Sequence, residues 1–379
     1  MTTMVSPKTV QRTNLNTRQP ILKIIGLGGG GSNAVNRMIE LDLKGAEFIA
    51  ANTDMQALKQ SLAPKKICLG PRTTRGLGAG GNPSVGEMAA EESFPVLCDA
   101  LRGADMVFLA AGMGGGTGTG SIPVAARAAR AVGAVTVAIV TMPFSFEVGR
   151  RQKNAREGLA KLQPHADTLI TVPNDQLLKI APQNLPLEMA FRMADDVLRQ
   201  GVQGISELIT QPGLINVDFA HVRQVMQMGG GSLLSIGIGE GPNKATKAVD
   251  YALHHPLLEA ISVDDATAII ANFTGGSDLT FMELMEAMSY LAEQTHNHAE
   301  IIPGVITDDR MQDRAQVILI ITGLGATPLD THPAVRVQAA PTPATAAQPA
   351  AQASHAETAV MEMAATDLDL PAFMRRRVR

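Results

Sequence analysis

Two glycine-rich stretches in this sequence have the residue types and spacing needed to bind an anion. GLGGGGSNA begins at Gly26, and GMGGGTGTG runs from Gly112 to Gly120. Each follows a short apolar run and precedes a helical pattern. Glycine lets backbone N–H groups approach a phosphate closely, and the positive end of the following helix favours negative charge. Two such loops on neighbouring strands would hold one anion from two sides.

The first glycine loop permits two other interpretations. Gly26, Gly28 and Gly31 match the GxGxxG dinucleotide fingerprint, a weak signal that would indicate an NAD-dependent enzyme. The other interpretation is a tight strand-to-helix turn that binds nothing. The loop contains no lysine, which excludes a P-loop. Ser32 or Asn33 is expected to cap the following helix.

The second glycine loop offers hydroxyl donors as well as backbone donors, from Thr117 and Thr119. We expect the next helix to run from Ile122 to Val132, with Pro123 in its first turn, where proline is well tolerated. A single dinucleotide site needs only one glycine loop, so two loops favour an anion held between them. The alternative, a glycine loop without structure, fits poorly with the strand and helix patterns beside it.

Apolar runs and helical patterns alternate through the first half of the chain and predict an α/β fold with a doubly wound, mainly parallel sheet. Strands are expected from Ile21, Phe48 and Met106 and at VTVAIV and TLITV, with helices around Ala34 and Arg150. Apolar residues at three- and four-residue spacing then predict one long central helix over residues 187–210. A smaller α+β domain is expected next, with strands near Leu233, Thr267, Glu300 and Ala315 and helices near Lys244 and Leu279.

The chain therefore divides into six expected segments. They are a flexible tail (1–20), a nucleotide-binding domain (21–186), the central helix (187–210), an α+β domain (211–325), a linker (326–366) and a terminal peptide (367–379). The linker is rich in Ala, Pro, Thr and Gln and cannot bury a core, so it is expected to be disordered.

The composition excludes several classes of function. A net charge of −4 provides no cationic field for nucleic acid, and 3% aromatic residues argue against base stacking. Cys68 and Cys98 have neither metal-site nor disulfide-framework spacing and fit a reduced, cytosolic protein. No apolar run approaches the roughly 18 residues needed to span a bilayer, so membrane contact would be indirect. No metal site made of protein side chains is expected.

The segment GGGTGTG, from Gly114 to Gly120, resembles the signature of the tubulin/FtsZ superfamily. The resemblance covers Ile21 to Gly325 and is closer to the FtsZ family, because the long acidic C-terminal helices of tubulin are absent. Other similar stretches are NTDMQAL, GLGAGGNP, MPFSFE, VPNDQLL, ADDVLRQGVQGI, PGLINVDFA and HPLLE. The resemblance implies a tubulin-like fold and head-to-tail polymerisation with GTP or GDP and Mg²⁺. It also implies a role in the division ring, in the cytoplasm at mid-cell.

The resemblance assigns nucleotide contacts to individual residues. The phosphates would be held by Gly29, Gly30, Gly31, Ser32, Asn33, Gly114, Gly115, Gly116, Thr117, Gly118 and Thr119. The pocket would be closed by Asn52 and Gly80, the ribose held by Glu147 and Arg151, and guanine contacted by Asn174, Phe191 and Asp195. A carboxylate accepts hydrogen bonds from the guanine N1–H and 2-amino groups, which adenine lacks, so ATP should be rejected.

Hydrolysis is assigned by the same resemblance to the loop PGLINVDFAHVRQ, with Asn216, Asp218 and His221 as the candidate catalytic residues. FtsZ-like loops carry two acidic residues three apart, and here the second position is His221. A neutral imidazole orients water less strongly than a carboxylate but can accept its proton. Slower hydrolysis, histidine as the working base and a non-hydrolysing relative therefore all stay open. Taken alone, Asp218 is an ordinary helix N-cap.

Geometry supports catalysis between subunits. Asp195 would lie near the base, and Thr210 ends the same helix fifteen residues later, about 22 Å away at 1.5 Å per residue. Asp218 would then not reach the phosphates of its own chain. A second subunit would complete the site, and a head-to-tail contact that does not close produces a filament.

The terminal peptide DLDLPAFMRRRVR has an acidic start, an apolar centre and four arginines. A frayed terminus is the simplest interpretation. Apolar residues after an unstructured linker are more useful to a partner protein than to solvent. The segment resembles the FtsZ tail peptide, which implies docking to membrane tethers such as FtsA or ZipA, and no nucleic-acid partner is expected.

Overall fold

The computed structural model describes residues 19–147, 149–180, 182, 184–210, 213–215, 217–227, 231–255, 266–296 and 298–324 of the 379-residue chain. The N-terminal tail before residue 19, Asn216, the 326–366 linker and the terminal peptide lie outside these residues. None of the described helices is long and apolar enough to cross a membrane.

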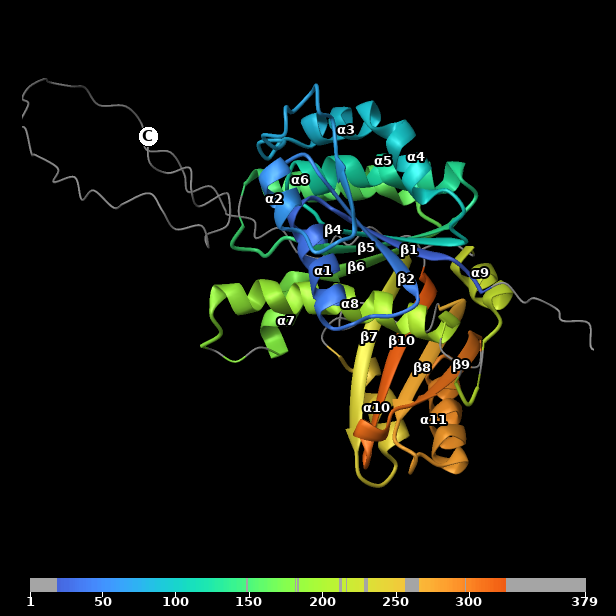
Figure 1. Ribbon diagram of the computed structural model, residues 1–379. Coiled ribbons are helices and arrows are strands. Elements are labelled where there is room, and N and C mark those ends of the chain that lie inside the picture. The colour runs from blue at the N-terminus through green and yellow to red at the C-terminus, as the bar shows by residue number, and fades with distance from the viewer. Residues whose placement is uncertain are drawn as a thin grey trace, which may run out of the picture. The chain divides into compact units, whose positions relative to one another are not determined.

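Six strands form a parallel half-sheet in the order β3-β2-β1-β4-β5-β6 (Figure 1). They are β1 (Leu22–Leu27), β2 (Ala46–Asn52), β3 (Lys65–Cys68), β4 (Met106–Gly112), β5 (Val135–Met142) and β6 (Thr168–Pro173). Every neighbouring pair is parallel. β1, β4 and β5 are buried along almost their whole length, as strands covered on both faces are.

Helices cover both faces of this half-sheet (Figure 1). They are α1 (Gly28–Glu40), α2 (Met55–Gln60), α3 (Pro83–Glu92), α4 (Phe94–Leu101), α5 (Thr117–Ala131), α6 (Arg150–Leu162) and α7 (Asn174–Ile180). Side chains alternate between the two faces along a strand. Ile24 therefore packs in a cluster with α1 residues, whereas its neighbour Ile25 packs in a second cluster with residues of α4 and α5. The predicted doubly wound arrangement is confirmed.

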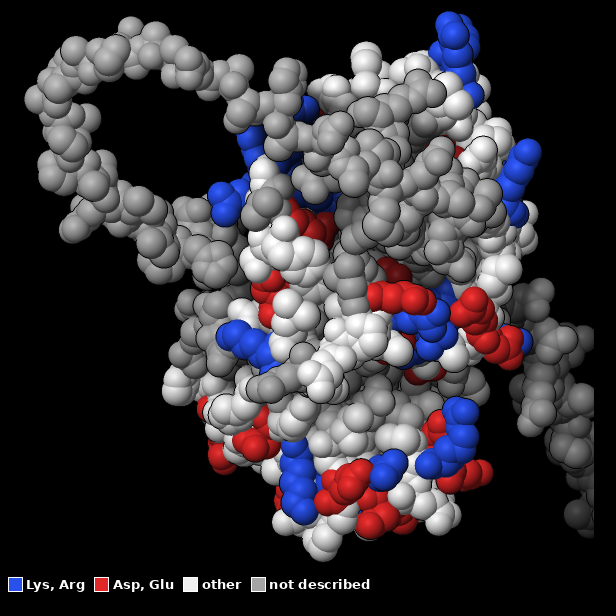
Figure 2. Space-filling model, turned by 90° about the vertical axis from the view of Figure 1, so that its left-hand side faces the viewer, with Lys and Arg blue, Asp and Glu red and all other residues white. Residues whose placement is uncertain are grey.

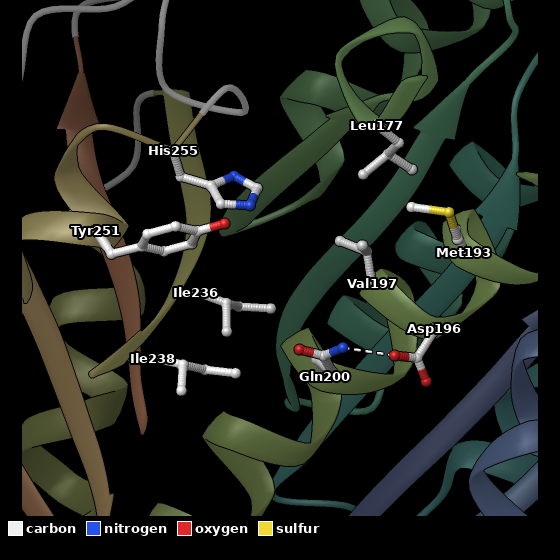
Figure 3. A pocket seen from close by; sticks show the side chains of 9 residues that line it. All are labelled: Leu177, Met193, Asp196, Val197, Gln200, Ile236, Ile238, Tyr251 and His255. Carbon is white, nitrogen blue, oxygen red and sulfur yellow. Dashed lines mark hydrogen bonds between the residues drawn. The ribbon is translucent and has the colours of Figure 1, made fainter. Parts of the chain in front are cut away.

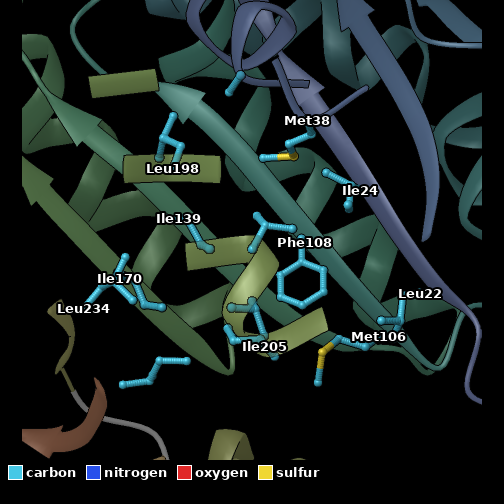
Figure 4. Packing of buried hydrophobic residues seen from close by; sticks show 14 of the residues in the cluster. Leu22, Ile24, Met38, Met106, Phe108, Ile139, Ile170, Leu198, Ile205 and Leu234 are labelled. Atoms are coloured by element: carbon cyan, nitrogen blue, oxygen red, sulfur yellow. The ribbon is translucent and has the colours of Figure 1, made fainter. Parts of the chain in front are cut away.

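The predicted central helix is α8 (Leu187–Thr210). Its residues Leu198 and Ile205 are fully buried and lie in one cluster with Phe108 of β4 and Met38 of α1 (Figure 4). Burial of each such side chain stabilises the fold by roughly 1.5–3 kcal/mol. The cluster also includes Leu234, so α8 packs against both halves of the sheet.

Four further strands extend the sheet in the order β7-β10-β8-β9. They are β7 (Gly231–Glu240), β8 (Ala268–Gly275), β9 (Glu300–Thr307) and β10 (Arg314–Leu324), with helices α9 (Phe219–Gln227), α10 (Lys244–Leu253) and α11 (Phe281–Gln294) and short 3₁₀ turns at Gln163–His165 and Asp309–Met311. β10 is antiparallel to β7 and β8, whereas β8 and β9 are parallel. Only two residue pairs, Leu169–Gly231 and Ile170–Ser232, connect β6 to β7. The four strands therefore continue the parallel half as one ten-stranded sheet.

Two sequence predictions about helix starts were wrong. α1 begins at Gly28, its N-cap residue is Leu27, and no side chain caps it, so Ser32 and Asn33 lie inside the helix. α5 begins at Thr117, which places Pro123 in the helix interior instead of the first turn. The cause is the same in both loops: the glycine-rich segment itself adopts the first helical turn. The N–H groups that lack a partner within the helix therefore belong to glycine-rich segments in both helices.

Charged residues of both signs occur on the face of the protein drawn in Figure 2. Lysine and arginine are interspersed there with aspartate and glutamate. This distribution agrees with the small net charge of −4.

Candidate nucleotide-binding site and catalytic loop

The carboxyl ends of the parallel strands meet at one edge of the sheet, which is where ligands bind in open α/β folds. In the sheet register, Leu27 at the end of β1 lies between Ala51 of β2 and Ala111 of β4. Both predicted glycine loops follow strands that end at this edge. The sheet therefore brings together segments that are more than eighty residues apart in the sequence.

The two glycine loops contact each other directly. A β-carbon added at Gly28, where φ is +71°, would lie 2.8 Å from the backbone nitrogen of Gly118. One added at Gly30 would lie 3.3 Å from the nitrogen of Gly112. Any side chain at these positions would push the loops apart. The N-termini of α1 and α5 are thereby held side by side, and both favour an anion.

Thr119 supports the second glycine loop from inside. Its Oγ1 accepts a hydrogen bond from the backbone N–H of Gly114 at 2.8 Å, and its side chain is buried. Gly114 itself has φ of +95°, and a β-carbon there would lie 2.9 Å from the carbonyl oxygen of Arg151. The loop thus requires glycine at this position for both backbone conformation and space.

Two further segments border the glycine loops. Thr53, which follows β2, shares a hydroxyl–hydroxyl hydrogen bond of 2.5 Å with Thr117. The buried side chain of Asn52 accepts a hydrogen bond from the N–H of Asp54 at 3.2 Å. The loop that contains Gly80 approaches from the other side, where a β-carbon on Gly116 would lie 2.8 Å from the nitrogen of Asn82. Asn52 and the loop that contains Gly80 therefore both lie beside the second glycine loop.

Glu147 and Arg151, the predicted ribose contacts, form an ion pair with Oε2 and Nε 2.6 Å apart. Glu147 is buried, and its Oε1 accepts a hydrogen bond from the N–H of Phe144 at 2.9 Å. Since Arg151 also lies against Gly114, the pair borders the second glycine loop. Glu147 is therefore held both by Arg151 and by the backbone of the loop after β5.

An aromatic cluster lies at the start of α8. The rings of Phe144 and Phe191 meet edge to face with centroids 5.5 Å apart, and Phe146 stacks on Phe144 at 5.1 Å. Phe146 is half exposed. Asn174, at the junction of β6 and α7, is buried, and its Oδ1 has no hydrogen-bond partner among the described residues. Such an acceptor is costly unless a ligand or water bonds it.

Asp195 lies on α8 four residues after Phe191, so the two side chains share one face of the helix. Burial, and then the negative charge of Asp196, raise the pKa of Asp195 to about 7. A carboxyl group in this environment gains strongly from a ligand that donates hydrogen bonds to its charged form.

The loop with Asp218 lies beyond the opposite end of α8, beside α9 (Figure 1). Asp218 caps α9 through one oxygen, since its Oδ1 accepts a hydrogen bond from the N–H of Ala220 at 3.1 Å. His221 is in the first turn of α9, and its Nε2 lies 2.7 Å from Oε1 of Glu300. The structure therefore groups Asp218 and His221 together, at the other end of α8 from the nucleotide-site residues.

The comparisons with known proteins agree with this arrangement. Residues 21–182 match the GTPase domain of the Tubulin/FtsZ family, and residues 230–325 match the C-terminal domain of the FtsZ family. The structure is similar to an empty FtsZ dimer from M. jannaschii, with 44% sequence identity and a TM-score of 0.78 over 82% of this chain and 90% of that chain. The chain belongs to the FtsZ family.

More distant structures share the fold. CetZ2 from Haloferax volcanii, in a GTPγS-bound protofilament, has 20% identity and a TM-score of 0.69 over 81% of this chain and 94% of that chain. The GDP-bound monomer of CetZ1 from the same organism has 19% identity and a TM-score of 0.70 over 81% of this chain and 96% of that chain. The tubulin-like fold of an FtsZ-family protein, predicted from the sequence, is confirmed.

This FtsZ-family chain also contains a cavity of about 260 Å³ between α8 and the second half of the sheet (Figure 3). It is lined by Leu177, Met193, Asp196, Val197, Gln200, Ile236, Ile238, Tyr251 and His255. None of the predicted nucleotide contacts is among these residues. The cavity is therefore separate from the candidate nucleotide site, although Asp196 adjoins Asp195 in the sequence.

Sequence reasoning missed several residues of the two sites. Thr53, Phe144 and Phe146 lie in stretches that resemble the FtsZ family, but no individual role was predicted for them. Glu300 was predicted only as the beginning of a strand. The signal for Phe144 was available, because aromatic residues make up only 3% of this FtsZ-family sequence and two of them flank Ser145. Nothing in the sequence pairs Glu300 with His221, since 79 residues separate them.

Proposed function

We propose that this FtsZ-family protein binds and hydrolyses GTP and polymerises head to tail into the filaments of the division ring. One observation carries the proposal: the glycine loops and the Asp218 loop lie at opposite ends of α8. From Asp195 to Thr210 the helix rises about 22 Å. One chain alone therefore does not bring Asp218 to the phosphates, and a second copy completes the site.

The phosphates occupy the space between the N-termini of α1 and α5. Backbone N–H groups of Gly29 to Gly31 and of Gly114 to Gly118 bind them, with the hydroxyls of Ser32 and Thr117. The buried Ser32 Oγ has no hydrogen-bond partner among the described residues, which supports a ligand there. Asn33, exposed on the first turns of α1, borders the same space, as do Asn52 and Gly80. Glu147 and Arg151 hold the ribose.

Guanine binds at the start of α8. Phe191 provides an apolar face, Asp195 accepts hydrogen bonds from N1–H and the 2-amino group, and Asn174 bonds the remaining edge. The raised pKa of Asp195 supports this role, because a guanine that donates two hydrogen bonds stabilises the charged form. Adenine donates neither of these bonds and would leave the carboxylate unpaired.

Mg²⁺ accompanies the nucleotide. Among the residues that the structure describes, no group of three or more acidic, histidine or cysteine side chains is arranged to hold a metal ion. Mg²⁺ prefers phosphate oxygens and water with few protein ligands, so the nucleotide itself supplies most of its coordination. When bound, it neutralises charge that develops on the phosphates.

Polymerisation follows because the nucleotide edge of one subunit contacts a different surface, the Asp218 loop, of the next. Such a head-to-tail contact can be repeated from subunit to subunit and produces a filament when it does not close into a ring. Leu77 beside the nucleotide edge and Leu214 in the Asp218 loop are 81% and 77% exposed, which fits surfaces that a neighbour covers. FtsZ of M. jannaschii is described as a dimer, and CetZ2, of the same fold, in a protofilament. Hydrolysis then occurs between subunits, where Asp218, with Asn216 and His221, orients the attacking water.

The division ring, the cytoplasmic location at mid-cell and docking of the 367–379 peptide on a tether such as FtsA or ZipA complete the proposal. They rest on membership of the FtsZ family and on the composition of the terminal segments. Removal of residues 367–379 should leave GTP-driven polymerisation intact and abolish tether binding.

Sedimentation with GTP, combined with measurement of phosphate release, tests the central proposal. GTP should pellet the protein and release phosphate, and ATP or NAD should do neither. Asp218→Ala should retain GTP binding but lose hydrolysis, and Gly115→Ala should lose GTP binding. If a mixture of the two variants recovers hydrolysis, the site is shared between subunits. Hydrolysis that is equally fast in the unpolymerised protein would reject the shared site, and polymers without phosphate release would indicate the non-hydrolysing alternative.

A further inference from the structure

β9 is the edge strand of the ten-stranded sheet, and the loop that leads to Asp218 runs along its free edge. The N–H of Leu214 donates to the carbonyl of Val305 at 2.9 Å, and the N–H of Val305 donates to the carbonyl of Ile215 at 3.3 Å. These bonds form an isolated antiparallel bridge. A β-carbon at Gly213 would collide with the carbonyl oxygen of Val305, so the loop backbone lies directly against the strand.

A second contact between the loop and β9 lies five residues back along the strand, about 17 Å away at 3.3 Å per residue. Here Glu300, the first residue of β9, contacts Nε2 of His221 at 2.7 Å. The backbone N–H of His221 also donates to the carbonyl of Asp218 at 3.0 Å. β9 thus holds the loop on both sides of Asp218, once by backbone and once by a side chain.

The contact with Glu300 decides which nitrogen of His221 carries the proton. An ionised carboxylate only accepts hydrogen bonds, so Nε2 must be the donor. In a neutral imidazole the other nitrogen, Nδ1, is then an acceptor. No described residue forms a hydrogen bond with Nδ1, and the histidine side chain is 42% exposed. Nδ1 is therefore accessible to a water molecule or to a second subunit.

We propose that Glu300 is a positioning residue for GTP hydrolysis, which holds His221 so that Nδ1 accepts the proton of the attacking water. This inference rests on the proposed function. The water oxygen forms a bond to the γ-phosphorus while the bond from that phosphorus to the β–γ bridging oxygen breaks. The electron pair of the broken bond stays on GDP. The water proton moves to Nδ1, the imidazolium contacts the Glu300 carboxylate, and the proton then passes to solvent.

The pair explains how the loop functions with a histidine at position 221. Asp218 is the acidic residue of the loop, and β9 places a second carboxylate, that of Glu300, against the imidazole of His221. The competing explanation is an ordinary surface ion pair, since Glu300 is also 44% exposed. Such pairs contribute about 0–1 kcal/mol to stability and nothing to catalysis. The two explanations make different kinetic forecasts.

Hydrolysis per polymerised subunit should be measured for Glu300→Ala and Glu300→Gln, with Glu240→Ala as the matched control. Glu240 is likewise an exposed strand-end carboxylate, paired with Arg314 at 3.0 Å. Glu300→Ala should lower kcat about tenfold with KM for GTP within about twofold. Glu300→Gln keeps an acceptor oxygen for Nε2–H and should recover part of that loss. Glu240→Ala should match the parent protein. A Glu300→Ala kcat within twofold of the parent would overturn the proposal.

A double-mutant cycle with His221→Ala tests whether Glu300 acts through the histidine. Glu300→Ala should have little further effect on kcat in the His221→Ala background, because the effects of coupled residues do not add. Equal effects in both backgrounds would assign Glu300 a role independent of His221 and reject the proposal.

Histidine ¹⁵N–¹H correlation spectra of the unpolymerised GDP form give a measurement that needs neither filaments nor hydrolysis. The His221 signal, identified by its loss in His221→Ala, should show protonation at Nε2 in the parent and a mixture of tautomers in Glu300→Ala. Protonation at Nδ1 in the parent would sink the inference. If instead Asp218→Ala hydrolysed GTP at the parent rate, the proposed function would fail, whatever the tautomer.

Discussion

The hydroxyl oxygens of Thr53 and Thr117 lie 2.5 Å apart and connect the end of β2 to the first residue of α5. Thr53 is fully buried and lies outside the glycine loops, whereas Thr117 is part of the second glycine loop. The bond crosses the edge of the sheet beside the space proposed for the phosphates. The contribution of this bond to stability and the contribution of the Thr117 hydroxyl to nucleotide binding can therefore be tested separately.

Thr53→Val and Thr117→Val remove the same hydrogen bond but should differ in their effect on GTP binding. Each should lower the free energy of unfolding by about 1–3 kcal/mol, since one buried hydroxyl loses its partner or is replaced. Thr117→Val should also weaken GTP binding, whereas Thr53→Val should leave it nearly unchanged. Thermal unfolding and fluorescent GTP titration provide the two measurements. Equal losses of affinity would show that the bond itself positions the nucleotide.

GTP affinity should depend on pH through Asp195, whose pKa without nucleotide is about 7. Guanine requires the charged carboxylate, so affinity should fall about tenfold for each pH unit below 7 and level off above it. Asp195→Asn should bind weakly with little of this dependence. Asp196→Asn removes the neighbouring charge that helps to raise the pKa of Asp195, so it should keep the pH dependence but shift it to lower pH. An Asp195→Asn variant with the parent's pH profile would contradict the assignment.

The same raised pKa predicts a stability change in the nucleotide-free protein. A carboxyl group with a folded-state pKa above its unfolded value contributes stability at low pH that is lost as the pH rises through about 7. Asp195→Asn should therefore raise the melting temperature most at pH 8 and by progressively less as the pH falls toward about 4, the ordinary pKa of an aspartate. For a chain of this size, about 1 kcal/mol corresponds to less than roughly 2 °C, because the shift per kcal/mol falls with chain length. A variant less stable than the parent at pH 8 would show that the carboxylate has a stabilising partner.

Gly114→Ala and Gly115→Ala separate folding of the phosphate loop from binding. At Gly114 an alanine would have φ of +95° and a β-carbon 2.9 Å from a carbonyl oxygen, whereas at Gly115 nothing lies within 4 Å. Gly114→Ala should destabilise the nucleotide-free protein by at least about 1–3 kcal/mol, and Gly115→Ala by little. Both should weaken GTP binding. Gly115→Ala places a methyl group in open space beside the proposed phosphates, and Gly114→Ala forces the loop to move away from Arg151. Normal GTP affinity in Gly115→Ala would move the phosphates away from this loop.

His221→Asp should slow hydrolysis, although it gives the loop a second acidic residue three positions after Asp218. Glu300 lies 2.7 Å from the His221 ring, so the new carboxylate would meet a like charge. Hydrolysis per polymerised subunit should fall about fivefold to tenfold, and His221→Asp/Glu300→Gln should recover much of it. Faster turnover in His221→Asp alone would mean that the native histidine is a weakened substitute for the acid and not the base.

The sequence alone determined most of the local structure and identified the two glycine loops that the fold brings together. The apolar period predicted α8 over 187–210, and the observed helix has these bounds, because a long amphipathic stripe is a local property of the chain. The alternation of apolar runs and helical patterns was enough to predict the parallel half-sheet. The two glycine loops were enough to propose an anion-binding site. The helix starts were missed, since glycine-rich backbone gives no signal for where a loop becomes a first helical turn.

Only the tertiary structure decided which distant residues meet. β7 pairs with β6, so the strands of the predicted smaller α+β domain continue the sheet of the first domain. Edge-strand pairing brings the Asp218 loop against β9 and sets Glu300 on His221, 79 residues away. The burial of α8 gives Asp195 its raised pKa. These contacts depend on the order of the strands and on the packing of α8 across the sheet. The apolar pattern of a segment shows that it forms a strand or a helix, but it does not show which distant segment packs against it.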